Sequence, residues 1–524
     1  MAAPVHDERK PERAMWSKAC RLWITLDCRM YTLYEGRLSP VVGSRRMDER
    51  LRASNGIWRR RNNVNPITGG VGSTARRLMP MVVALGTLLM GGWFMAHTAP
   101  GHIPDIWAHV YRIVGITNGD TLARPVESQS YLHSTTGNVG GYVDQEWIDF
   151  SLEYYDGYDP AVVKPETLVY DGRDGADVPC NNAAVNSPVA YAPQLVGFLV
   201  GKAFGLSPLA TYHCAEALML VVSTFLGAVS VMLLPKWRIV CGLVMLCPLM
   251  LRHNSFAISA DSFTQAMVFL LSCMVFRAFL RKVSTAYCVA LAAVCVAVVM
   301  CKFIYGPLCL LTLLIPWAQH RLSTAARTDG VGDAVGAMAD EVPPDVPLHR
   351  DPHMWILAIG DALAIGWLMV WMKLTGWFVT TPLMVSYEEM TARKTALLTD
   401  PDTILSALKA VFASIVQAKS NLDRPIDSLV IRLCWILMLA VLVAVLAASV
   451  LRAFERSMSA FCWGTTVMSF GIVMLMYVAL WLQYTPTDAS AVEGMQHRYF
   501  LPLTVLCTLC TCECLQAIAA RLRR

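Results

Sequence analysis

Long apolar runs decide what this chain can fold into. The sequence alternates between stretches of about twenty mostly apolar residues and short clusters of charged residues, and about twenty apolar residues are what an α-helix needs to cross a bilayer. Only 16% of the residues are charged, against about 25% in soluble proteins. We therefore expect an all-α polytopic membrane protein. A soluble enzyme, a disordered chain and a disulfide-stapled secreted module are excluded.

Ten of these runs are long enough to be transmembrane helices. An eleventh apolar run, 189–204, is barely long enough and contains Tyr191, Pro193 and Lys202. The ten predicted spans are Leu78–Thr98, Leu209–Leu234, Ile239–Phe256, Phe263–Leu280, Thr285–Cys301, Ile304–Gln319, Met354–Trp377, Leu429–Leu451, Ala460–Gln483 and Phe500–Ala519.

The distribution of basic residues sets the predicted orientation. The first 77 residues hold 16 Lys and Arg against 7 Asp and Glu, which by the positive-inside rule places the N-terminus in the cytoplasm. Basic clusters at the ends of the second, fourth, eighth and tenth spans must also lie inside, and this works only if 189–204 does not cross. We therefore predict a juxtamembrane helix at 189–204, two cytoplasmic termini, and a multi-pass location in the cell membrane.

This topology divides the chain into a basic cytoplasmic tail, 1–77, and a transmembrane domain, 78–524. The basic residues of the tail serve as a topology signal on a solvated segment, or they attract anionic lipid head groups. Residues 320–353 form a Gly, Ala, Asp and Pro-rich cytoplasmic linker.

Two larger segments are predicted outside. The first, 100–208, carries thirteen acidic residues against five basic ones. Its aromatic residues are of the kind that stack on sugar faces, and they are equally typical of a solvated loop with interfacial aromatics. The second outer loop, 379–427, contains a helical stretch, 403–417, that could dip into the membrane.

The chain has 17 cysteines, and nearly all lie inside apolar runs, where a thiol acts as a small apolar packing residue. Cys507, Cys510, Cys512 and Cys514 lie close together, but their spacing is irregular and no His accompanies them, whereas structural zinc takes paired C-x-x-C geometry. We favour packing over metal binding there, and we expect no disulfide framework.

Polar groups gather where the topology puts the outer membrane face. Asp105 and His109 follow the first span, and their four-residue spacing places both on one helical face. A carboxylate there can take a proton from an attacking hydroxyl. The alternative is an ordinary helix N-cap, since Pro104-Asp105 before an apolar-periodic stretch is a common helix start.

Two further residues belong to the same predicted face. Tyr191 lies at the start of the juxtamembrane helix, where it could equally be an interfacial anchor. Asp261 lies between the third and fourth spans, where it could equally be a helix N-cap.

Two cations complete the set. Arg498 opens the last span between Gln496 and Tyr499; its planar fork suits phosphate oxygens, although an Arg at this depth can also merely snorkel. Lys302 lies between two apolar runs that meet at the outer face. Ionisable groups at membrane depth are functional by default, with structural pairing as the alternative.

These residues fall in motifs of a known family. Gly494 to Pro502 reads G-M-Q-H-R-Y-F-L-P. This resembles the G-x-Q-G-R-Y-F-x-P hallmark of a domain-of-unknown-function family of predicted bacterial membrane proteins, with His497 in place of the second Gly. The resemblance runs from about Met79 to the C-terminus. Four more family motifs match in order: P-D-E-x-x-H at 104–109 with Ile106 at the Glu position, S-P-x-x-Y-x-P at 187–193, S-x-D at 259–261 and K-x-x-Y-x-P at 302–307.

That family is similar to the GT-C superfamily, integral membrane glycosyltransferases that use polyprenyl-phosphate-linked sugars. The resemblance implies a GT-C-like fold, Asp105 as general base, Arg498 with Lys302 stabilising the phosphate leaving group, and inversion at the anomeric carbon. A divalent cation stays open, because some GT-C enzymes need one and the second acid beside Asp105 is missing. The remaining candidate site residues are His109, for catalysis, and Tyr191, Asp261, Gln496 and Tyr499, for substrate.

Three functions compete. The first is a glycosyltransferase that moves a sugar to a cell-envelope glycan or lipid-linked acceptor on the outer face, with membrane lipids and no nucleic acid among its partners. The second is a transporter or flippase of lipid-linked saccharides; the single large outer loop and the lack of inverted repeats argue against it. The third is a non-catalytic envelope-assembly protein, in which Asp105 and Arg498 would tolerate substitution.

Overall fold

The structure is a computed structural model that describes residues 71–126, 139–154, 174–328, 347–376, 385–418, 425–486 and 489–523. These residues belong to the second of two units, which begins at Val64. Most of the predicted tail 1–77, parts of the first outer loop and the middle of the linker 320–353 lie outside the described residues.

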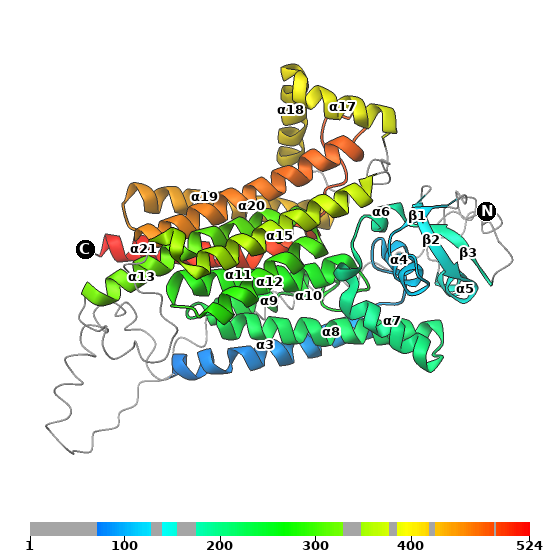
Figure 1. The fold of residues 1–524 in the computed structure, drawn as a ribbon, viewed down its shortest axis with the longest axis horizontal. Coiled ribbons are helices and arrows are strands. Elements are labelled where there is room, and N and C mark those ends of the chain that lie inside the picture. The colour runs from blue at the N-terminus through cyan, green and yellow to red at the C-terminus, as the bar shows by residue number, and fades with distance from the viewer. Residues whose placement is uncertain are drawn as a thin grey trace, which may run out of the picture. The chain divides into compact units, whose positions relative to one another are not determined.

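Eight helical segments within the described part of the chain are long and apolar enough to cross a membrane, which confirms the all-α polytopic class. Figure 1 shows α11, α15, α19 and α20 running along a common direction. The segments are α3 (Val71–Ala96), α8 (Pro208–Leu233), α11 (Ala260–Leu280), η4 with α13 (Phe303–Leu314, Ile315–Thr328), α15 (Pro352–Leu374), α19 (Pro425–Val450), α20 (Arg456–Gln483), and the last span formed by η7 (His497–Tyr499), η8 (Leu501–Leu503) and α21 (Thr504–Leu522).

The third predicted span is wrong as a single helix. Ile239–Phe256 forms two short helices, α9 (Arg238–Met245) and α10 (Pro248–Leu251), because Pro248 has no N–H to continue the first one. Trp237 before α9 donates to Glu513 of α21 at 2.6 Å, and Met250 in α10 accepts from Thr504 at 3.8 Å. The segment therefore runs along part of α21 as two short helices. The remaining predicted span, Thr285–Cys301, is α12 and has 17 residues.

The segment predicted as the first outer loop contains a small sheet, which the sequence pattern does not predict. Strands β1 (Arg124–Pro125), β2 (Val139–Asp144) and β3 (Gly175–Pro179) pair antiparallel in that order. β2 requires Gly140, since a Cβ there would lie 1.9 Å from the Val178 carbonyl oxygen. The same region holds α4 (Ile106–Thr117), whose first ten residues are all buried, together with α5 (Gln145–Glu153) and α6 (Asn181–Ala184). This packing holds the start of α4 in place.

The juxtamembrane segment is a short helix packed on α8. It begins with η3 (Pro188–Tyr191) and continues as α7 (Ala192–Phe204), which has 13 residues and so a length of about 20 Å, less than a bilayer core of about 30 Å. Gly201 lets the helices approach closely, because a Cβ there would lie 2.2 Å from the Thr211 hydroxyl. Gln194 donates to the carbonyls of Ala257 and Ser259, both at 3.1 Å. Hence α7 steadies the turn that leads into α11.

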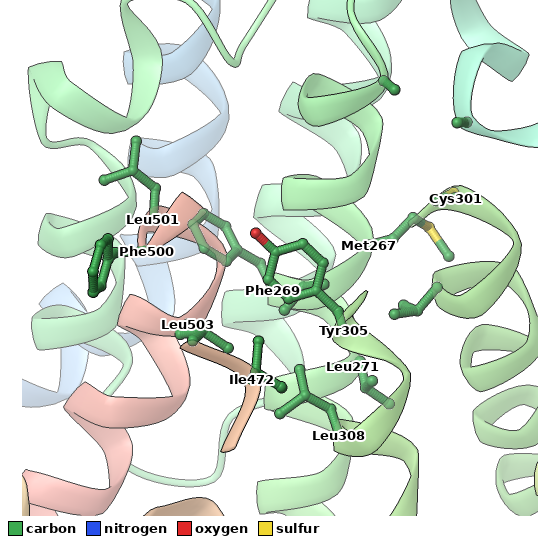
Figure 2. Close-up of a cluster of buried hydrophobic side chains, with 14 of the residues drawn as sticks. Met267, Phe269, Leu271, Cys301, Tyr305, Leu308, Ile472, Phe500, Leu501 and Leu503 are labelled. Carbon is green, nitrogen blue, oxygen red and sulfur yellow. The ribbon is translucent and has the colours of Figure 1, made fainter. Parts of the chain in front are cut away.

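A buried apolar cluster supports the beginning of the last span. Figure 2 shows Tyr305 and Leu308 of η4 and Phe269 of α11 close to Leu501 and Leu503 of η8. The Tyr305 hydroxyl donates to the carbonyl oxygen of Tyr499 at 3.0 Å. The core thereby fixes the backbone of η7.

The segment predicted as the second outer loop contains a helical hairpin, α17 (Tyr387–Thr399) and α18 (Pro401–Gln417). Asp400 joins the two helices and caps α18, since its carboxylate accepts from the backbone of Asp402 and Thr403. This location agrees with the helix expected at 403–417.

Candidate active site

Four charged side chains from distant parts of the chain form one cluster, which we call the ion cluster: Asp105, Asp261, Lys302 and Arg498. Arg498 Nη2 donates to Asp105 Oδ2 at 2.5 Å, and Arg498 Nε lies 3.5 Å from Asp261 Oδ2. Lys302 Nζ donates to the other oxygen of Asp261. Two acids thus face two cations.

Asp105 takes part in this cluster because of its backbone. It occupies the N-cap position of α4 in the left-handed region, with φ 60°, which is unfavourable for a residue other than glycine. Its carboxylate makes no hydrogen bond to the helix it precedes. Asp105 thus stands at the helix start that the N-cap alternative expected, but its side chain pairs with Arg498 and does not cap α4.

Asp261 and Lys302 are placed by the ends of two helices. Ser259 is the N-cap of α11 and accepts from the backbone N–H of Asp261, so Asp261 lies in the first turn and is not the cap. Lys302 ends α12 and begins η4 with an extended backbone. Ser187, whose hydroxyl donates to the Met300 carbonyl at 2.7 Å, ties this end of α12 to the start of η3.

Arg498 is held by the tight segment before the last span. Gly494 has φ +82°, and a Cβ there would lie 2.6 Å from the Tyr484 ring, so another residue would be strained at this turn. Lys302 and Arg498 both lie over the Tyr499 ring, at 5.1 Å and 5.7 Å from its centroid.

A second group lies beside the ion cluster and involves His109. His109 Nδ1 is 2.6 Å from the Tyr191 hydroxyl, and Asn186 Nδ2 donates to the same hydroxyl at 3.2 Å. His109 and Tyr191 are both buried. Arg112, one turn further along α4, points elsewhere and donates to the carbonyls of Asp120 and Thr121.

Burial and neighbouring charges set the protonation of Asp105 and His109. Burial alone would raise the pKa of the Asp105 carboxyl, but the charge and hydrogen bond of Arg498 hold it below its usual value. Burial lowers the pKa of His109 to about 4, and Asp105 and Asp261 oppose this only in part. At neutral pH the site therefore holds an ionised Asp105 and a neutral His109.

The ion cluster differs in exposure from one side to the other. The Asp105 side chain is 34% exposed, whereas that of Asp261 is 13% exposed. Asp105 is thus the carboxylate that a second molecule can reach, and Asp261 is the one that holds the two cations together.

Comparison with known proteins gives a family. The model of a family described as "predicted membrane protein (DUF2142)" matches residues 88–507, which is most of the chain. The chain belongs to the DUF2142 family. No curated protein and no solved structure matches it.

The structure of this DUF2142 chain brings most of the predicted site residues together. Tyr499 contacts both cations of the ion cluster. His109 contacts Tyr191 and lies close enough for the charges of Asp105 and Asp261 to act on it. Gln496 is the exception: it precedes η7 with an extended backbone and makes no side-chain capping bond there. What each residue does remains a prediction.

One partner was missed from the sequence. His497, which replaces the second Gly of the family motif, lies with its Nδ1 2.5 Å from the carboxylate of Asp427 at the start of α19. The only sequence signal for Asp427 was its position at the outer end of a predicted span. The departure from the motif is thus accommodated by a local pair next to Arg498.

Two groups of possible metal ligands lie away from the ion cluster in the described chain. Cys462 of α20 approaches Cys510 and Cys514 of α21, with the three sulfur atoms within 4.8 Å of one another. Cys295, Cys309 and Asp361 form the other group, in which Thr312 donates to Asp361. All six residues are buried, and we read both groups as packing between helices.

Proposed function

We propose that this DUF2142 chain is a membrane glycosyltransferase that resembles the GT-C enzymes and moves a sugar from a polyprenyl-phosphate-linked donor to a glycan or lipid-linked acceptor. The observation that carries the proposal is the ion cluster. An accessible carboxylate, Asp105, shares Arg498 with a second acid, and Lys302 lies beside them. This arrangement suits a phosphate next to a general base.

The cations would bind the donor phosphate. A phosphate oxygen can replace Asp105 as the partner of Arg498, whose fork donates two hydrogen bonds at once. Asp105 then loses the neighbouring charge that lowers its pKa, so it becomes a better base for the acceptor hydroxyl. Asp261 remains to hold Lys302 and Arg498 in position.

The reaction is a single displacement. Asp105 takes the proton of the acceptor hydroxyl. At the same time the oxygen of that hydroxyl forms a bond to the anomeric carbon on the face opposite the phosphate. The bond between that carbon and the phosphate oxygen breaks, and the electron pair leaves with the polyprenyl phosphate. Arg498 and Lys302 stabilise the charge that develops on the leaving oxygen, and the configuration inverts.

A small pocket lies beside Lys302, close to where the donor phosphate would bind. Its lining mixes polar and apolar side chains and includes two tryptophans. Trp367 and Trp371 stack with centroids 5.5 Å apart, and Trp371 donates to the Val185 carbonyl at 2.8 Å. The lining residues include Asn186, Ser187, Lys302, Phe303, Trp367 and Trp371.

The charges at the other end of the helices support an outer location for the ion cluster. Asp261 begins α11 and Arg281 follows its end, while Arg498 precedes α21 and Arg521 lies in its last turn. Basic residues therefore mark the ends away from the cluster. Under the positive-inside rule these ends are cytoplasmic.

The test is the glycan composition of the cell envelope in a deletion strain complemented with wild type, Asp105→Asn or Arg498→Ala. The exposed Asp402→Asn on α18 is a matched control. We expect one sugar or linkage to be lost and to be restored by wild type and Asp402→Asn alone. Full rescue by both site variants would overturn the catalytic proposal and favour a non-catalytic assembly role.

Purified protein in proteoliposomes separates transfer from transport. With a polyprenyl-phosphate-linked sugar and an acceptor present, a transferase releases polyprenyl phosphate and forms a glycoside. A flippase moves the intact donor between leaflets and releases no phosphate. Transport without cleavage would therefore replace our proposal with the second candidate function.

A further inference from the structure

Helix α18 presents an apolar face that nothing in the described chain covers. Ile404, Leu408, Phe412 and Val416 recur every four residues, and Leu405 lies beside them, so they share one side of the helix. Phe412 is 67% exposed and Val416 is 63% exposed. Side chains of this size are costly to leave in water when they form one continuous stripe.

The opposite face of α18 is fixed to the protein. Ala407, Ala410 and Ser414 are buried. The Ser414 hydroxyl donates to the Val492 carbonyl at 3.0 Å, and Val492 donates its N–H back to the Ala410 carbonyl at 3.4 Å. Val492 belongs to the segment that leads directly to Arg498, so α18 lies at the same end of the helices as the ion cluster.

The partner helix strengthens this attachment. Arg393 of α17 is buried and donates to the carbonyls of Trp481 and Thr485, at 2.6 Å and 2.7 Å, where α20 ends. Arg393 also pairs with Glu389 at 2.5 Å. Both ends of the loop between α20 and η7 are thus anchored to the hairpin.

The direction of α18 indicates what covers its apolar face. Figure 1 shows α18 running crosswise to α19 and α20, so it lies in the plane of the membrane when those helices cross it. Its exposed charged residues, Asp402 and Lys409, border the apolar stripe and do not interrupt it. Ile426 and Leu429 at the beginning of α19 are also exposed, at 70% and 57%, so α18 is not the only element with exposed apolar side chains at this end of the described chain.

We propose that α18 is an interfacial helix that inserts this apolar face into the lipid leaflet at the ion-cluster end of the helices. Its partner is the boundary between phospholipid head groups and acyl chains, where amphipathic helices lie flat. Because its other face holds the loop before η7, α18 sets the level of Arg498 relative to the head groups. The inference does not depend on the transferase chemistry.

The test is photocrosslinking from the helix to lipid. A benzoylphenylalanine replaces Phe412, or Ser406 as the matched control on the exposed polar side of the same helix, in the full chain in nanodiscs of radiolabelled phosphatidylglycerol and phosphatidylethanolamine. We expect about tenfold more lipid adduct from position 412 than from position 406, since only the apolar face reaches the acyl boundary.

Two results would overturn the inference. Equal labelling at the two positions would mean that the face is not in the leaflet, and an adduct with a second copy of the chain would mean that protein covers it. If either variant fails to give a monodisperse protein, the exposed pair Val416 and Gln417 repeats the comparison one turn further along. Loss of transferase activity alone would leave this result unchanged.

Discussion

Two ion pairs along the last span, one at its beginning at Arg498 and one inside α21 at Glu513, differ in how fully their polar atoms are satisfied. At Glu513, Lys236 donates to one carboxylate oxygen at 2.9 Å and Trp237 to the other at 2.6 Å. At Arg498, the buried Nε makes only the 3.5 Å ion pair with Asp261 and no hydrogen bond among the described residues, and Asp105 is 34% exposed. The first pair is closed and only joins helices. The second is open and can rearrange around a ligand.

Replacing Arg498 is the strongest test of whether the two ion pairs differ in function. We expect Arg498→Ala to lower the rate of sugar transfer by about 10²-fold or more, because a preorganised donor to developing charge is worth about that much. Arg498→Lys should fall between, since it keeps the charge and loses the fork. Transfer rates in proteoliposomes and thermal midpoints are measured together, with Lys409→Ala as the control. If the rate falls only in proportion to the amount of folded protein, the Arg498 pair joins helices in the same way as the Glu513 pair.

Lowering the pH should destabilise the fold through His109, which lies beside the ion cluster. The folded pKa of about 4 lies below the usual value of 6.5, so folding favours the neutral imidazole. The stabilisation is complete above the unfolded pKa and is lost as the pH falls from about 6.5 towards 4, on the order of 3 kcal/mol. The folded pKa of Asp105 is also lowered. Its contribution to stability is therefore lost only as the pH falls below the usual value of 3.8.

The measurement is the thermal midpoint of wild type and His109→Gln between pH 7 and pH 4.5. The variant should lose less stability than wild type over this interval, because a neutral amide has no proton to gain. Parallel curves for the two proteins would show that His109 does not carry the acid sensitivity.

Much of the helical part of the fold could be predicted because apolar length alone marks a crossing. The same rule failed at 239–256, where Pro248 breaks the helix inside a run whose composition is still that of a span. The sheet was out of reach for a different reason: β1 has two residues, and β2 is held by pairing with β3 across a long gap in sequence. Such pairing leaves no periodic signal.

The sequence predicts which charged residues belong to the candidate site, but it does not predict how they pair. Family motifs and the outer face selected Asp105, Asp261, Lys302 and Arg498. Which acid pairs with which cation depends on the left-handed backbone at Asp105 and on the cap at Ser259, and neither is written in the spacing of the motifs.

The closed pair offers a stability test with no effect on chemistry. Glu513→Ala leaves Lys236 and Trp237 without their acceptor, and we expect a loss of about 1–2 kcal/mol, less than for a fully buried pair because Lys236 is partly exposed. The thermal midpoint should fall while the transfer rate per folded molecule stays the same. A loss of activity per folded molecule would mean that Glu513 contributes to the function, and the distinction between the two ion pairs would no longer hold.

The smallest expected effect concerns the Tyr191 hydroxyl. Tyr191→Phe removes the partner of His109 and Asn186 but keeps the buried ring. A net hydrogen bond is worth about 1 kcal/mol, so we expect a fewfold slower transfer and a small fall in the thermal midpoint. If the hydroxyl orients His109, the pH at which wild type loses stability should move in Tyr191→Phe. If the hydroxyl contributes hydrogen bonds but does not orient His109, that pH should stay the same and the thermal midpoint should fall equally at every pH.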